Sequence, residues 1–288
     1  MQTAIDVTIQ VFVISTMLAL GLQVPPQRIV RGVRDWKTIA TGSFLSLVVI
    51  PALGLLAVSG LGLKGEIRTG YLLIAFSPAA PYAVKLIAIA RGEVASLVGL
   101  IVTLQLAGVV WVPVLAHLFL DPATGLEYSQ LFAAIVLLQL VPLIVGLVAQ
   151  GTKRMSSPVT TRAVGAISNA SFGALVALIL IHDFPRVVQI LDIGVLSAVV
   201  GLIAASLMAG VFIAGHKPSA RRSLGLVSAA RKGGLALVIA TNTFGGDANA
   251  VITIVAYALI ELVLLTSVAI WWRASDRRVT TGPLLSGD

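Results

Sequence analysis

Long apolar stretches follow one another along almost the whole chain of 288 residues. A helix needs about 20 predominantly apolar residues to cross the hydrocarbon core of a bilayer, which is roughly 30 Å thick. The sequence contains nine such stretches, at 4–23, 36–59, 67–91, 94–120, 128–150, 159–182, 189–215, 219–243 and 248–272. Because 58% of the residues are hydrophobic and only 11% are charged, we expect an all-α polytopic membrane protein.

No polar block between these stretches is long enough for a soluble domain. We therefore expect a single membrane domain over residues 1–275 and a short cytoplasmic tail over 276–288. The first stretch has no basic segment before it and no small-residue cleavage site after it, so it is expected to remain a helix rather than be removed as a signal peptide.

The basic residues are distributed unevenly between the two sides that this layout defines. Fourteen of the 20 Lys and Arg residues fall on one side, and only Lys64, Arg68 and Arg186 fall on the other. The positive-inside rule then places the N-terminus outside and the C-terminus in the cytoplasm, in a cell (inner) membrane. The basic charge is explained by topology, so nucleic acid is not expected as a partner.

Little in the sequence indicates an enzyme, a metal site or a cofactor site. The chain has no cysteine, and its three histidines are far apart in the sequence. The segment GLGLKG at 60–65 has the spacing of a dinucleotide-binding loop but no strand before it. A membrane enzyme or sensor would require a catalytic constellation or an attached soluble module, and neither is found. We expect no enzymatic activity, no metal and no cofactor.

Three cationic residues, Lys85, Arg231 and Lys232, fall inside apolar stretches. A cation at bilayer depth costs at least about 2.5–3.5 kcal/mol on insertion scales, so such residues usually face a cavity, a partner charge or a substrate path. The alternative, in which these side chains reach the lipid interface, remains open.

The two stretches that hold these cations are both interrupted. Pro78 and Pro81 precede Lys85, and Gly233 and Gly234 follow Lys232. In secondary transporters, paired interruptions of this kind mark the binding site, where two broken helices meet. We expect 67–91 and 219–243 to cross near mid-membrane, bringing Lys85 close to Arg231 or Lys232.

The order of these segments resembles the bile acid:sodium symporter superfamily. The resemblance runs from MLALGLQV and VIPALGLL through SPAAPYAVKLIAIARGEVASLVGLIVT to RKGGLALVIATNTF. It implies two inverted repeats, a panel domain and a core domain, with two broken helices crossing in the core. Here the repeats would cover about 1–120 and 128–275, as four plus five spans, with one helix missing from the first.

The chain departs from the family pattern at the positions that would bind sodium. The family's oxygen ligands at the two breaks are replaced by Ala83, Val84, Val227, Arg231 and Lys232, while another polar position falls near Ser46. The resemblance therefore implies fixed positive charges where bound sodium would otherwise lie.

A site rich in cations favours an anion, most simply a carboxylate. Glu261 is the one acidic residue deep in a predicted span, and we expect it to pair with Arg231 or Lys232; a position at the lipid interface or beside Arg273 is the alternative. Tyr82 and Asn242 are further candidates for substrate binding. Other polar residues within apolar spans could line the path or hold helices together: Thr103, Gln105, Ser168, Asn169 and Thr241.

These observations predict a secondary transporter that moves a small organic anion by alternating access without sodium. Either facilitated diffusion or proton coupling through Lys85 or Glu261 would fit. The alternatives are a permease similar to auxin-efflux or arsenite carriers, or a sodium-coupled symporter with displaced ion sites.

Overall fold

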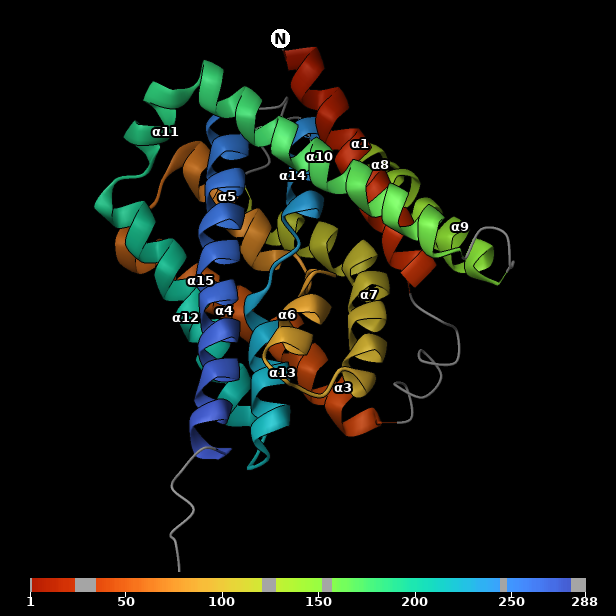
Figure 1. Cartoon of the computed structure of the whole chain (residues 1–288). Coiled ribbons are helices and arrows are strands. Elements are labelled where there is room, and N and C mark those ends of the chain that lie inside the picture. Colours follow the sequence, from red (N-terminus) through yellow and green to blue (C-terminus); the bar gives the residue numbers. More distant parts are fainter. Residues whose placement is uncertain (1, 24–34, 121–127, 152–156, 244–247, 281–288) are drawn as a thin grey trace, which may run out of the picture.

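The computed structural model describes residues 2–23, 35–120, 128–151, 157–243 and 248–280 (Figure 1). Within these ranges every regular element is a helix, which confirms the predicted all-α class. The helices of the first part of the chain are α1 (Gln2–Gln23), α3 (Trp36–Phe44), the π-helical segment η1 (Leu45–Val49), α4 (Ile50–Leu61), α5 (Gly65–Phe76), α6 (Ala83–Ile89) and α7 (Ala95–Phe119).

The second part of the chain also contains both long and broken helices. It comprises α8 (Tyr128–Ile135), the π-helical segment η3 (Val136–Leu140), α9 (Val141–Gln150), α10 (Pro158–His182), α11 (Phe184–Ile190), α12 (Ile193–Ile213), α13 (Pro218–Ala229), α14 (Gly233–Thr243) and α15 (Ala248–Thr280).

Seven continuous helical stretches of the described chain are long and apolar enough to cross a membrane. The predicted spans 67–91 and 219–243 are each split into two shorter helices, α5 with α6 and α13 with α14. The total of nine spans and the division into two inverted repeats remain predictions.

Most boundaries lie close to the predicted ones, and two differ more clearly. The seventh span was expected to begin at 189, but α12 begins at Ile193, because the side chain of Asp192 accepts a hydrogen bond from the N–H of Val195 at 2.7 Å and caps the helix. The tail was expected from 276, but α15 continues to Thr280. Residues 281–288 lie outside the described ranges.

The two broken segments cross and pair through their backbones. The N–H of Ala80 donates to the carbonyl of Ala230 at 2.9 Å, and the N–H of Lys232 donates to the carbonyl of Pro78 at 2.9 Å. Ala79 and Arg231 thereby face each other in a short antiparallel bridge. The prediction of two broken, crossing helices is confirmed, and each break satisfies backbone groups that the other leaves unpaired.

The causes of the two breaks differ. Pro78 and Pro81 lie between α5 and α6, where their missing N–H groups prevent a continuous helical ladder. Gly233 and Gly234, in contrast, form the first turn of α14, after the break has ended. A Cβ at Gly234 would lie 3.3 Å from atoms of both Phe12 and Val13, so this glycine lets α14 approach α1 closely.

The helices pack as two groups (Figure 1). We call α1, α8, η3, α9 and α10 the panel group, in which α1 packs along α9 and α10. The remaining helices, with both breaks, form the core group, in which α12 packs on α13 and α5 on α15. Gly21 and Gly146 face each other within the panel group, and a Cβ at Gly21 would lie only 2.5 Å from the carbonyl oxygen of Leu143.

Candidate functional site

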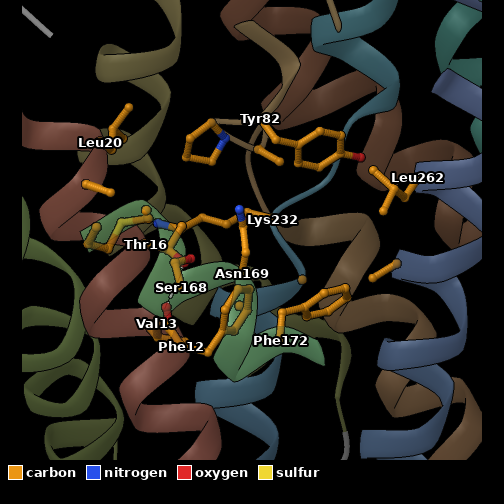
Figure 2. A pocket seen from close by; sticks show the side chains of 18 of the residues that line it. Phe12, Val13, Thr16, Leu20, Tyr82, Ser168, Asn169, Phe172, Lys232 and Leu262 are labelled. Carbon is orange, nitrogen blue, oxygen red and sulfur yellow. Dashed lines mark hydrogen bonds between the residues drawn. The ribbon is translucent and has the colours of Figure 1, made fainter. Parts of the chain in front are cut away.

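A cavity of about 470 Å³ lies between the panel group and the helix crossing (Figure 2). Figure 2 shows Lys232 near its middle, with Thr16, Ser168 and Asn169 close by, Phe12 and Phe172 on one side and Tyr82 on the other. The core group contributes most of the predicted site residues to the wall: Tyr82, Lys85, Arg231, Lys232 and Glu261.

Arg231 is buried, and its guanidinium binds backbone carbonyl groups of the core group. Nη1 donates to the carbonyl of Ser77 at 2.9 Å and to that of Ser46 at 3.3 Å, while Nε and Nη2 donate to the carbonyl of Ser228. A guanidinium offers five N–H donors, and four hydrogen bonds from its nitrogens are made here.

These carbonyls are available because of where their helices end or are interrupted. Ser77 follows α5, and Ser228 belongs to the last turn of α13, where carbonyls have no partner within the helix. Ser46 lies in η1, where Ile50 donates to Leu45, five residues back. The next such bond would come from Pro51, which has no N–H, so the carbonyl of Ser46 is left for Arg231.

Lys232 is also buried, but its side chain contacts different groups. The ammonium donates to Oε1 of Gln105 on α7, at 2.5 Å, and to Oε1 of Gln139 on η3. Gln105 in turn donates from Nε2 to the carbonyl of Ala79 in the first break, at 2.8 Å. The ammonium of Lys232 is thus held by two neutral amides, one from each helix group.

Glu261 meets Arg231 in a way that differs from the predicted ion pair. Its Oε1 accepts hydrogen bonds from the backbone N–H of Arg231, at 3.0 Å, and from the hydroxyl of Tyr82. The structure shows an ion pair between Arg186 and Asp183 at the surface, but none between Glu261 and either Arg231 or Lys232. The predicted pairing of side-chain charges is therefore wrong, because the guanidinium is already bound by carbonyl groups.

Lys85 lies on α6, lines the cavity and is exposed. Among the described residues its ammonium has no hydrogen-bond or ion-pair partner. The structure places Lys85, Arg231 and Lys232 along one cavity, but only Arg231 and Lys232 are buried.

The other polar candidates differ in where their side chains lie. Ser168 and Asn169 line the cavity, and Ser168 shares a hydrogen bond of 2.5 Å with Thr16. Thr103 and Thr241 instead donate to carbonyl groups of their own helices. The backbone of Asn242 belongs to α14, but its side chain lies outside the described part of the structure.

Several residues in or beside the cavity were not predicted. Gln139 is a single polar residue within an apolar span, and the criterion that singled out Gln105 would also have found it. Phe12 and Phe172, whose ring centroids are 5.2 Å apart, carry no sequence signal that separates them from other apolar residues of their helices.

Comparison with known proteins agrees with this architecture. No curated protein sequence gives a significant match to the chain. Residues 10–190, more than half of the chain, match the model of the sodium bile acid symporter family. The match includes the first break and ends before the second. Members of this family are membrane transporters rather than enzymes, and the chain belongs to the sodium bile acid symporter family.

Proposed function

We propose that this protein is a secondary transporter of a small organic anion, that it works by alternating access, and that it does not couple transport to sodium. The proposal includes the predicted orientation in the cell membrane, with the N-terminus outside and the C-terminus in the cytoplasm. The observation that carries it is the guanidinium of Arg231, bound by the carbonyl oxygens of Ser46, Ser77 and Ser228.

Carbonyl oxygens at unwound helix segments are the groups that coordinate sodium in secondary transporters. In this protein the guanidinium of Arg231, a cation that belongs to the chain itself, donates hydrogen bonds to such carbonyls. Three of the positions where the family resemblance implies sodium ligands hold the apolar side chains of Ala83, Val84 and Val227. Both features support a site in which the positive charge is permanent and needs no ion gradient.

The charge balance of the cavity supports an anionic substrate. Lys232 and Lys85 carry positive charges along the wall, and neither pairs with a carboxylate in the described chain. A buried ammonium held only by neutral amides remains attractive to a negative ligand, most simply a carboxylate. Glu261 is the acidic residue of this wall, and it binds a backbone N–H and the hydroxyl of Tyr82.

The position of the cavity supports alternating access. Its wall is shared between the panel group and the crossing, so rocking of one group against the other would move the opening from one side of the membrane to the other. Proton coupling through Lys85 or Glu261 and facilitated diffusion are both compatible with this arrangement.

The test begins with thermal unfolding of purified protein against hexanoate, phenylpropanoate, lactate and pyruvate, because a bound ligand stabilises the fold. Uptake of the stabilising acid is then measured in proteoliposomes for the native protein, for Lys232→Gln and for the control Lys64→Gln. Lys64 is exposed before α5 and away from the cavity. We expect Lys232→Gln to abolish uptake and the control to retain it; equal uptake by both variants would refute the proposed site.

A further inference from the structure

Gln139 brings the panel group into contact with the buried cation of the core group. It lies in η3 and is only 3% exposed. Its Oε1 accepts a hydrogen bond from the ammonium of Lys232, while its Nε2 has no hydrogen-bond partner among the described residues. A buried amide donor without a partner is unusual, and it indicates a ligand or a second conformation.

The ammonium of Lys232, which contacts Gln139, also has a hydrogen-bond donor to spare. It has three N–H donors, of which two are used by the amide oxygens of Gln105 and Gln139. No carboxylate of the described chain forms an ion pair with it. Lys232 lines the main cavity, whereas Gln139 lies behind it, beside a gap too small for a water molecule, so a ligand in the cavity reaches Gln139 only when the amide leaves the ammonium.

We propose that Gln139 is a substrate-binding residue, and that the carboxylate of the substrate sits between Lys232 and Gln139. One carboxylate oxygen replaces Oε1 of Gln139 on the ammonium, and the carboxylate accepts a hydrogen bond from Nε2 of Gln139. This arrangement neutralises the buried charge and gives the free amide donor an acceptor. The inference rests on the proposed function, because it assumes that a carboxylate binds at Lys232.

The same exchange of partners connects binding to the movement of the helix groups. In the structure the bond from Lys232 to Gln139 joins the core group directly to the panel group. A bound carboxylate takes that place and bridges both residues, so binding replaces one contact between the two groups by another. A ligand can shift a conformational equilibrium only through such differential contacts.

The π-helical geometry of η3 fits this role. Widened turns of this type occur frequently at functional sites, where they interrupt the regular ladder. In the core group, η1 supplies the carbonyl of Ser46 to Arg231, and in the panel group η3 supplies the amide of Gln139 to Lys232. Each π-helical segment thus contacts one of the two buried cations.

The experiment compares Gln139→Leu and Gln139→Glu with the control Gln150→Leu, which changes a glutamine at the end of α9 away from the cavity. The probe is whichever of hexanoate, phenylpropanoate, lactate and pyruvate the native protein takes up fastest. We expect Gln139→Leu to raise the KM of uptake about tenfold with little change in maximal rate, because one hydrogen bond to a charged group is lost. The control retains the native KM.

Gln139→Glu gives a second readout that does not depend on the leucine variant folding. Its carboxylate occupies the place proposed for the substrate, so uptake is abolished while the thermal unfolding temperature is maintained or raised. A native KM in Gln139→Leu, or carboxylate uptake at the native rate by Gln139→Glu, overturns this inference and leaves the proposed function intact. Absence of uptake of all four acids by the native protein refutes both.

Discussion

Glu261 binds the backbone N–H of Arg231, at 3.0 Å, and not its guanidinium. Gln105 makes the corresponding contact at the other break, where its Nε2 donates to the carbonyl of Ala79 at 2.8 Å. Because Ala79 and Arg231 face each other at the crossing, each break is held by the second helix that follows it, α7 for the first break and α15 for the second. Two polar side chains in α7 and α15 thus fix the geometry on which both cations depend.

Removing the acceptor at Glu261 is expected to destabilise this crossing. Glu261→Leu leaves the N–H of Arg231 and the hydroxyl of Tyr82 without their acceptor, at a cost of about 1–3 kcal/mol for a buried donor. Glu261→Gln keeps an oxygen at the same position and is expected to cost less. Thermal unfolding in detergent compares the two variants, and a leucine variant as stable as the native protein would contradict the assigned role.

Removing the guanidinium of Arg231 is expected to create sensitivity to sodium. Arg231→Ala leaves the carbonyls of Ser46, Ser77 and Ser228 directed toward space that a small cation can enter. Sodium is then expected to raise the unfolding temperature of this variant by a few degrees relative to choline, through binding to the folded state. Arg231→Lys, which keeps a cation there, is the control. An alanine variant equally stable in both salts would argue against a cation site.

The exposed cation is expected to contribute less to substrate binding than the buried one. Lys85 is exposed, whereas Lys232 is buried, and the attraction between opposite charges is weaker at an exposed position. Lys85→Met is therefore expected to raise the KM of uptake several-fold, while Lys232→Met abolishes uptake. An equal loss in both variants, measured in the same proteoliposomes, would contradict this order.

The close contact between α1 and α9 is expected to tolerate no side chain. A Cβ at Gly21 would lie 2.5 Å from the carbonyl oxygen of Leu143, so Gly21→Ala forces the two helices apart and costs about 1–3 kcal/mol. Gly173→Ala is the matched control, because nothing lies within 4 Å of its added Cβ. We expect the unfolding temperature of Gly21→Ala to be lower than that of Gly173→Ala. Equal unfolding temperatures would mean that the two helices move apart at no cost in stability.

Much of the fold was predictable because it depends on local chemistry. Apolar length predicts helices that can cross a membrane, and Pro78 and Pro81 predict a break because proline lacks an N–H. The position of the second break was predicted less accurately. Gly233 and Gly234 belong to the start of α14, and the break before them is held by pairing with the first break, which no local pattern encodes.

The site was predictable in its residue types but not in its contacts. Arg231 and Lys232 are adjacent, yet one binds carbonyl groups of the core group and the other binds amides of both groups. In an extended segment, successive side chains point to opposite sides, so the partners of each depend on the tertiary packing. As a polar residue within an apolar span Gln139 could have been listed with Gln105, but its contact with Lys232 depends on the packing of the panel group, which the sequence does not show.

The dependence of uptake on sodium tests the central claim most directly. Uptake of the stabilising carboxylate is measured in proteoliposomes with sodium outside, with choline in its place, and with sodium equal on both sides. The same three conditions are applied at several pH values. Because the guanidinium of Arg231 already uses the carbonyls at the crossing, we predict equal initial rates in all three salt conditions at each pH. Uptake that requires an inward sodium gradient would contradict the account.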